Sequence, residues 1–246
     1  MKPIRFTLLC LLLAAALALP GGADLPADPP GGRAELTETE DFGTEYLDRM
    51  IFLGESTTAH LRSRSQLRPE QIWANASGTM KLDSALLSRP IQEPLSGRSL
   101  TIPEAAAERR PAYLVLSFGL NGITGFVRDK EGYLDSYRTL IERIRQASPD
   151  TRIIVQSVYP VAPAECQTDW KFSVPPETIN SYVQTLNGWL PELCAGLPEV
   201  RFADTASVLR DGQGYLRPAC TTDGIHLTRG AYNEILLYLR THGWTE

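Results

Sequence analysis

The amino-acid sequence predicts a three-layer α/β domain, in which helices cover both faces of a parallel sheet of about five strands. Apolar runs of strand length are continuous rather than alternating, which is typical of strands buried on both faces of a parallel sheet. Segments with helical periodicity separate these runs. This alternation favours a doubly wound, flavodoxin-like sheet, in which ligands bind at the carboxyl ends of the strands.

The expected elements can be placed along the chain from these patterns. Predicted strands span residues 50–53, 71–76, 113–118, 153–158 and 200–203, and the segment at 71–76 is the weakest candidate. Predicted helices span residues 57–66, 102–109, 133–147, 176–194 and 228–240. Within 133–147, Leu134, Tyr137 and Ile141 recur at helical spacing, with charged side chains on the other face. No internal repeat and no second domain is evident in the sequence.

The N-terminal segment has the features of a secretory signal peptide. Two cations, Lys2 and Arg5, precede an apolar stretch at residues 6–19, and small residues at 16–18 or 21–23 could be cleaved. This stretch is shorter than the roughly 18 apolar residues that span a bilayer. We therefore predict a signal peptide at residues 1–23, a secreted or extracytoplasmic protein, and no membrane span after removal of the leader.

Composition divides the remaining chain in two. Residues 24–40 are rich in Pro, Gly and Ala and are predicted to form a flexible linker, which leaves residues 41–246 as one domain. Removal of Lys2 and Arg5 changes the formal charge from −5 to −7, and no basic run is present. Nucleic acid and anionic membranes are therefore disfavoured as partners. Nothing in the sequence predicts the oligomeric state.

Three cysteines lie beyond the predicted leader, at Cys166, Cys194 and Cys220. In an oxidising compartment they allow one disulfide and one free thiol. Cys166 and Cys220 fall in predicted loops, whereas Cys194 falls in a predicted helix, which favours a bond between Cys166 and Cys220. Three reduced thiols are the alternative, so the pairing stays open.

Residues capable of catalysis follow the predicted strands. Ser56 comes just after the first strand, Gly78 after the second and Asn121 after the third, while Asp223 and His226 lie on the loop before the last helix. A serine, an imidazole and a carboxylate supply a nucleophile, a general base and a group that orients the base. Taken singly, Ser56 could instead cap the following helix, and Gly78 could be a turn glycine with positive φ.

In type, order and strand context, Ser56, Gly78, Asn121 and His226 with Asp223 resemble the four signature positions of the SGNH, or GDSL-like, hydrolase family. The resemblance covers about residues 41–246 and implies the SGNH hydrolase fold. It also implies a catalytic triad of Ser56, His226 and Asp223, with an oxyanion hole formed by the Ser56 and Gly78 backbone N–H groups and the Asn121 side chain. One residue departs from the family pattern: Glu55 stands where the family usually has Asp. The extra methylene can shift the hydrogen bonds that brace this turn, so its effect on activity is open.

Other hydrolase classes lack support in the sequence. His60 and His242 have no partner at metal-ligand spacing, so neither a metal nor another cofactor is expected. Thr58 occupies the position two residues after Ser56, so the Gly-x-Ser-x-Gly elbow of α/β-hydrolases is absent.

These observations predict a secreted serine esterase that hydrolyses short acyl esters of small molecules or of extracellular glycans, with deacetylation of carbohydrate as one possibility. An O-acyltransferase with the same triad and a non-catalytic extracellular binding module are the alternatives. Five aromatic residues at or after strand ends could stack on sugars: Trp73, Phe118, Phe126, Tyr159 and Trp170.

Overall fold

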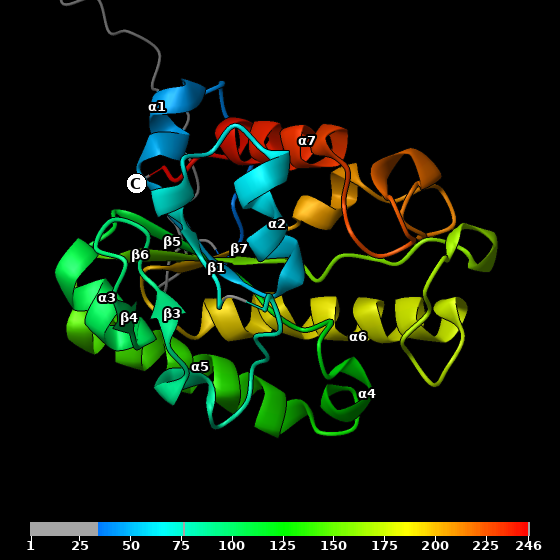
Figure 1. Ribbon diagram of the computed structural model, residues 1–246, viewed down its shortest axis with the longest axis horizontal. Coiled ribbons are helices and arrows are strands. Elements are labelled where there is room, and N and C mark those ends of the chain that lie inside the picture. The colour runs from blue at the N-terminus through cyan, green and yellow to red at the C-terminus, as the bar shows by residue number, and fades with distance from the viewer. Residues whose placement is uncertain (1–33, 76, 246) are drawn as a thin grey trace, which may run out of the picture.

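The computed structural model describes residues 34–75 and 77–245, so the predicted signal peptide and most of the predicted linker lie outside the described residues. Its centre is a five-stranded sheet in the order β2-β1-β5-β6-β7 (Figure 1). The strands are β1 (Met50–Gly54), β2 (Ile72–Trp73), β5 (Tyr113–Ser117), β6 (Arg152–Gln156) and β7 (Val200–Ala203). Every neighbouring pair is parallel. The doubly wound α/β fold predicted from the sequence is confirmed.

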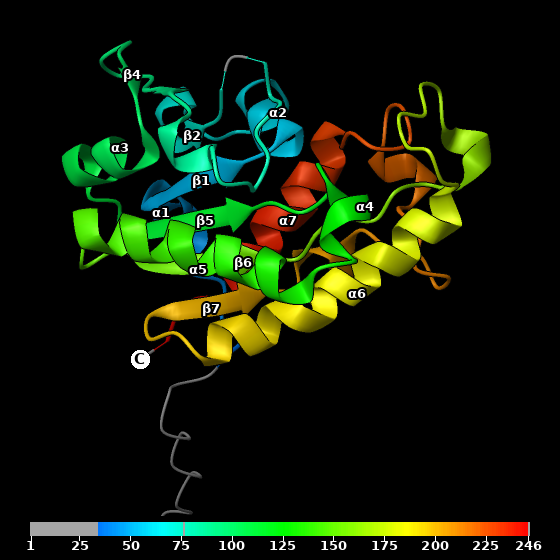
Figure 2. The same ribbon diagram turned by 90° about the horizontal axis from the view of Figure 1, so that it is seen from below.

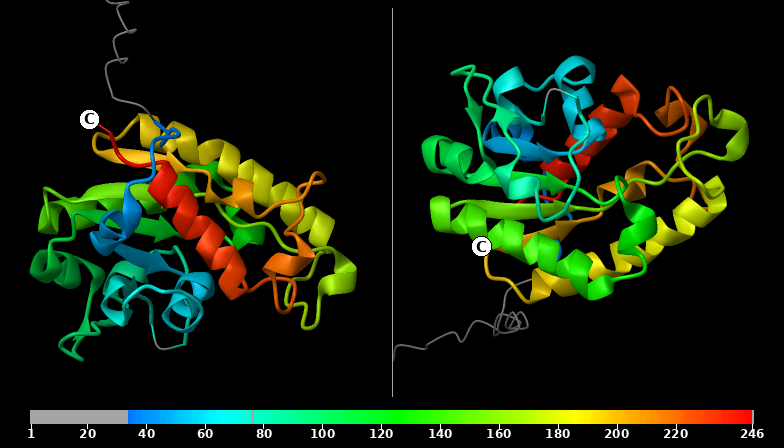
Figure 3. Two further views of the ribbon diagram at one scale, coloured as in Figure 1. Left: turned by 90° about the horizontal axis from the view of Figure 1, so that it is seen from above. Right: turned by 60° about the horizontal axis from the view of Figure 1, so that its bottom comes forward.

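Helices cover both faces of this sheet, as Figures 1 and 2 show. One layer contains α3 (Ile102–Arg109), α5 (Lys130–Ala147) and α6 (Pro176–Ala195), and the other contains α1 (Gly43–Asp48), α2 (Ser56–Arg64) and α7 (Arg229–Thr241). Seen from above, α7 runs across the face that it shares with α1 and α2 (Figure 3, left). Side chains from alternate strand positions enter the two layers: Leu53 packs into one hydrophobic cluster and Phe52 into the other.

Local capping interactions set several helix boundaries. Thr101 accepts a hydrogen bond from the Glu104 N–H at the start of α3, and Arg110 ends this helix in the left-handed conformation. The Asp129 side chain caps α5 through the Gly132 N–H, so α5 begins at Lys130 rather than at the predicted residue 133. Thr228 caps α7 in the same way.

The structure also contains short elements that the hydrophobic pattern does not predict. These are α1, the single turn α4 (Ile123–Phe126) and an antiparallel hairpin formed by β3 (Ile91–Gln92) and β4 (Ser99–Leu100). Each is too short to show a clear helical or strand period.

The last residues of the predicted linker pair with the edge of the sheet. Glu35 forms a parallel bridge with Phe202 of the edge strand β7. The Leu36 N–H donates to the Phe202 carbonyl oxygen (2.8 Å), and the Phe202 N–H donates to the Ala34 carbonyl oxygen (2.7 Å). These bonds satisfy backbone groups of an otherwise open sheet edge, and the Leu36 side chain, only 5% exposed, packs into the core.

All three cysteines of the described region are unpaired, so the favoured bond between Cys166 and Cys220 is not formed. Cys194 lies in the hydrophobic cluster on one face of the sheet, and Cys220 lies in the cluster on the other face. Among residues 34–75 and 77–245, no helix combines the length and the apolar character needed to cross a membrane.

Candidate active site

Ser56 is presented by a sharp junction between β1 and α2. Strand β1 ends at Gly54, Glu55 is extended, and Ser56 is the first residue of α2. Gly54 is required because β1 and β5 lie very close here: a Cβ atom on Gly54 would come within 2.4 Å of the Ser117 carbonyl oxygen. The start of α2 has no side-chain cap. The Ser56 hydroxyl is instead hydrogen-bonded to His226, so Ser56 is not a helix cap.

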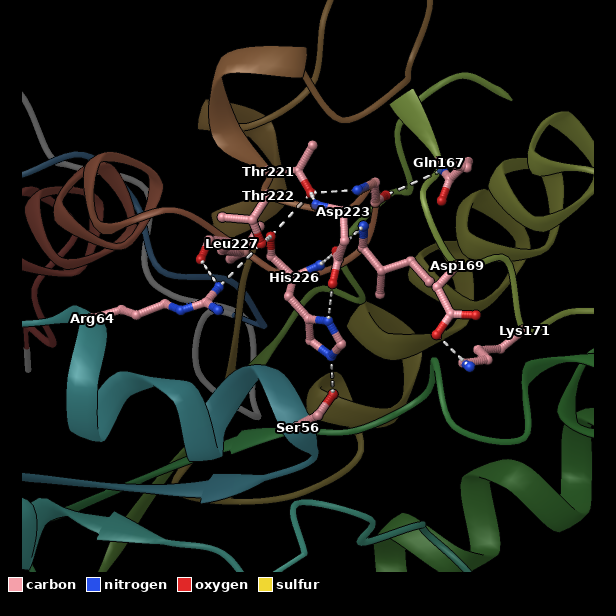
Figure 4. Close-up of polar contacts among 12 residues, drawn as sticks. Ser56, Arg64, Gln167, Asp169, Lys171, Thr221, Thr222, Asp223, His226 and Leu227 are labelled. Atoms are coloured by element: carbon pink, nitrogen blue, oxygen red, sulfur yellow. Dashed lines mark hydrogen bonds and ion pairs between the residues drawn. The ribbon is translucent and has the colours of Figure 1, made fainter. Parts of the chain in front are cut away.

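Ser56, His226 and Asp223 form a continuous hydrogen-bonded chain (Figure 4). The Ser56 Oγ lies 3.1 Å from His226 Nε2, and His226 Nδ1 lies 2.6 Å from Asp223 Oδ2. An ionised carboxylate can only accept hydrogen bonds, so Nδ1 carries the proton and Nε2 is free to accept from the serine hydroxyl. The geometry therefore matches a nucleophile, a general base and an orienting carboxylate.

The loop at residues 221–227, here called the catalytic loop, is held by its own hydrogen bonds. Gly224 has φ +94°, a conformation that favours glycine, and its N–H donates to Thr221 Oγ1 (2.9 Å). Asp223 Oδ1 accepts from the backbone N–H groups of His226 (2.7 Å) and Ile225 (2.9 Å). Although burial raises the pKa of Asp223, the hydrogen bonds from the His226 side chain and from these N–H groups lower it below its ordinary value. Asp223 is thus kept ionised beside His226.

Gly78 lies next to Ser56, and Asn121 contacts the preceding residue, Glu55; each lies on its own loop. Gly78 has φ +65°, and a Cβ atom at Gly78 would lie 3.5 Å from Ser56 Cα. Its N–H donates to the Asn75 carbonyl oxygen (3.2 Å) and so closes a turn. Asn121 follows β5, and its Nδ2 donates to the Met80 carbonyl oxygen (2.9 Å). The loops after β1, β2 and β5 therefore meet at one place on the carboxyl edge of the sheet.

Glu55 joins two of these loops. Its side chain is only 4% exposed, and it accepts hydrogen bonds from the Gly119 N–H (2.9 Å, to Oε1) and the Asn121 N–H (3.0 Å, to Oε2). Burial raises the pKa of Glu55 to about 7, although the backbone N–H groups of the 119–121 loop and the charge of Lys81 lower it. The glutamate that departs from the family pattern thus braces the loop that carries Asn121.

The titration of Glu55 predicts a pH-dependent stability. The folded state binds the Glu55 proton more tightly than the unfolded state, because the pKa rises from 4.5 to about 7 on folding. Stability therefore falls as pH rises between these values and levels off above them. We expect the unfolding free energy of the wild type, relative to Glu55→Gln, to fall by on the order of 3 kcal/mol over this range. Urea denaturation at pH 5, 6, 7 and 8 measures it, with the exposed Glu142→Gln as control. A constant difference, or one that grows with pH, would contradict the role of Glu55.

The five aromatic residues considered for stacking on sugars differ in their exposure to solvent. Trp73, Phe118 and Tyr159 are 0%, 2% and 7% exposed and belong to the core, so they cannot stack on a substrate. Phe126 and Trp170 are only partly buried. Trp170 lies on the loop whose Thr168 N–H donates to the Asp223 carbonyl oxygen (3.2 Å), and Figure 4 shows its neighbours Asp169 and Lys171 beside the catalytic loop.

Two further residues contact the catalytic loop and were not predicted from the sequence. The rings of His60 and His226 lie with their centroids 4.5 Å apart, and Arg64 Nη1 donates to the Leu227 carbonyl oxygen (2.7 Å). Both residues are on α2, four and eight residues after Ser56. This four-residue spacing places the three side chains on one face of a helix, and it is the sequence signal from which their position could have been predicted. Within residues 34–75 and 77–245, no group of three or more His, Cys, Asp or Glu residues could hold a metal ion.

The site thus places a serine at the end of the first strand beside an imidazole and a carboxylate. The sequence matches the GDSL-like Lipase/Acylhydrolase family over residues 52–233, a range that contains Ser56, Gly78, Asn121, Asp223 and His226. The chain therefore belongs to the GDSL-like lipase/acylhydrolase family. No curated protein matches it.

The comparison with solved structures finds similar proteins at low sequence identity. A Streptococcus pneumonia protein provisionally assigned as a platelet activating factor is 20% identical, with a TM-score of 0.55, and the match covers 82% of this chain and 91% of that one. A Bacteroides fragilis protein provisionally assigned as an acylhydrolase is 18% identical, with a TM-score of 0.49 and coverages of 84% and 89%. A GDSL-like lipase from Bacteroides thetaiotaomicron is 17% identical, with a TM-score of 0.48 and coverages of 80% and 91%.

Proposed function

We propose that this protein is a secreted serine esterase that removes short acyl groups, such as acetyl, from small molecules or extracellular glycans. The observation that carries the proposal is the chain of hydrogen bonds from Ser56 through His226 to Asp223. The apolar segment at residues 6–19, preceded by two cations, supports export.

The chemistry follows from the positions of the three side chains. Ser56 Oγ attacks the ester carbonyl carbon while His226 Nε2 takes its proton, and Asp223 stabilises the resulting imidazolium. Collapse of the tetrahedral intermediate breaks the ester bond, and His226 returns the proton to the departing alcohol. Water then attacks the acyl-enzyme, with His226 again as the base, and releases the carboxylic acid and free Ser56.

Negative charge on the tetrahedral intermediate requires hydrogen-bond donors. As the first residue of α2, Ser56 has a backbone N–H without a partner inside the helix, and Asn121 Nδ2 has a second hydrogen beyond the one donated to Met80. We propose these two groups as the principal oxyanion donors. The Gly78 N–H completes the hole when it exchanges the Asn75 carbonyl oxygen for the oxyanion.

The surroundings of the triad favour a short acyl group on a solvent-exposed substrate. The side chains of His226 and Asp223 are 29% and 32% exposed. Cavities of about 500 Å³, beside α6 and residues 210–214, and of about 290 Å³, beside α5 and residues 83–87, contain no residue of the triad. A long apolar acyl chain attached at Ser56 would therefore bury little of its surface in either cavity. An acetyl group has little apolar surface to bury, so it does not need such a cavity.

Hydrolysis of p-nitrophenyl esters of increasing acyl length tests this function. An apolar acyl pocket would contribute about 0.8 kcal/mol per CH₂, which is roughly a fourfold gain in kcat/KM for each one. We expect the purified protein to hydrolyse the acetyl ester, with no such gain from two to eight carbons. A steady rise in kcat/KM with length would contradict the short-acyl assignment, and a folded protein that hydrolyses none of the esters would overturn the esterase proposal.

A further inference from the structure

Helix α2 presents one stripe of side chains to the catalytic loop. Ser56, His60 and Arg64 are spaced four residues apart, so they lie on the same face of the helix over successive turns. All three contact the catalytic loop: Ser56 and His60 touch His226, and Arg64 touches Thr222 and Leu227. Arg64 appears beside this loop in Figure 4.

His60 packs directly against the general base. The two imidazole rings are tilted by 57°, with centroids 4.5 Å apart. His60 Nδ1 is buried and has no hydrogen-bond partner among the described residues, so the ring contact rather than a polar bond holds it there. Burial lowers the pKa of His60, and the charges of His226 and Arg64 lower it further, against a smaller opposite effect of Asp223. This shift favours the neutral form of His60, which does not repel an imidazolium on His226.

Arg64 holds the loop at its base. Its Nη1 donates to the carbonyl oxygen of Leu227 (2.7 Å), directly after His226, and lies 3.4 Å from Thr222 Oγ1. Thr221 and Leu227 form an isolated bridge, and the Thr222 N–H donates to the His226 carbonyl oxygen (3.0 Å). Because these bonds close the loop, the hydrogen bond from Arg64 to Leu227 restrains the whole loop rather than one residue.

The distance between Ser56 and His226 cannot be set by Asp223. Asp223 orients the imidazole but belongs to the same loop, so it moves with His226. Ser56 belongs to α2, so direct contacts between α2 and the loop restrain the distance between Ser56 and His226. His60 and Arg64 supply such contacts on the face of α2 that carries Ser56.

We propose that His60 and Arg64 are positioning residues, which dock the catalytic loop against α2 so that His226 Nε2 stays within hydrogen-bond distance of Ser56 Oγ. This inference rests on the proposed esterase function of the triad. It concerns residues outside the triad, because neither side chain forms a hydrogen bond with Ser56 Oγ or with the His226 ring.

Steady-state kinetics with p-nitrophenyl acetate test the inference with two pairs of variants. His60→Ala removes the ring, whereas His60→Phe keeps a ring in contact with His226 without a polar nitrogen. Arg64→Met removes the donors, whereas Arg64→Lys keeps one cationic donor. A displacement of about 1 Å between reacting groups can cost on the order of 100-fold in rate. We expect His60→Ala and Arg64→Met to lower kcat by about 10- to 100-fold, with KM within about twofold of wild type.

The conservative variants and controls distinguish positioning from general destabilisation. His60→Phe and Arg64→Lys should recover most of the lost kcat, and the rate of Ser56 labelling by a fluorophosphonate should follow kcat across the series. His242→Ala removes a histidine that stacks on Tyr238 at the end of α7, and Arg229→Met removes an arginine that reaches Ser63 of α2 but not the loop. Both controls should keep wild-type kcat.

The outcomes separate this inference from the function on which it rests. Wild-type kcat in His60→Ala and Arg64→Met, or a loss confined to KM, would overturn the positioning role while leaving the esterase intact. A loss in His60→Ala that His60→Phe does not recover would overturn the ring contact as its cause. A folded wild-type protein without hydrolysis or labelling would overturn the proposed function and this inference with it.

Discussion

The variant Ser56→Ala is expected to lose ester hydrolysis almost completely, with kcat reduced by about 10⁴-fold or more. Alanine removes the only oxygen within hydrogen-bond reach of His226 Nε2 on α2, so neither attack on the ester nor an acyl-enzyme is possible. The fold should persist, because the Ser56 hydroxyl makes no helix-capping bond. Hydrolysis of p-nitrophenyl acetate by purified protein, with circular dichroism as a check of folding, measures the effect.

Ser63→Ala is the matched control for this substitution. Ser63 lies on the same helix, is exposed, and bonds only weakly to the His60 carbonyl oxygen (3.4 Å). It should retain wild-type activity. If Ser56→Ala kept even a tenth of the wild-type rate, Ser56 would not be the nucleophile.

The variant Asn121→Ala is expected to lower kcat by about 10²- to 10³-fold, the usual effect of losing one oxyanion donor. KM should change little, because the bond to the oxyanion forms fully only in the transition state. Some stability should also be lost, about 1 kcal/mol, since Asn121 Nδ2 donates to the Met80 carbonyl oxygen. Kinetics and urea denaturation on the same preparation separate the two effects.

Asn233→Ala provides the comparison for Asn121, because Asn233 is an exposed residue of α7 and not of the loops that meet at Ser56. Its kinetics should match those of the wild type. A raised KM with unchanged kcat in Asn121→Ala would show that Asn121 binds the substrate rather than its transition state.

Much of the fold could be predicted from the sequence because its strands are buried on both faces. Residues 113–117 and 200–203 are apolar almost throughout, and this pattern is difficult to satisfy outside a parallel sheet. The bounds of α3 agree with the prediction because a capping box at Thr101 and a left-handed Arg110 define both of its ends. The edge pairing at residues 34–36 was not predictable, because it depends on the sheet edge that those residues meet rather than on their own composition.

In the candidate site, too, a local motif could be predicted from the sequence, whereas contacts between distant segments could not. Asp223 and His226 form a local motif, and the structure places Ser56 opposite them as the strand pattern suggested. Glu55 was visible only as a departure from a family pattern, because its role depends on the distance to the loop after β5. His60 was considered only as a metal ligand, and its contact with His226 requires the packing of α2 against the catalytic loop.

The central claim is that the hydrogen-bonded chain through His226 makes Ser56 an activated nucleophile. Reaction of the folded wild-type protein with a fluorophosphonate, followed by peptide mapping, tests this claim most directly. We predict one covalent adduct, located on Ser56 and absent from Ser56→Ala. A protein that stays unmodified, or that carries its adduct on a different serine, would contradict the claim.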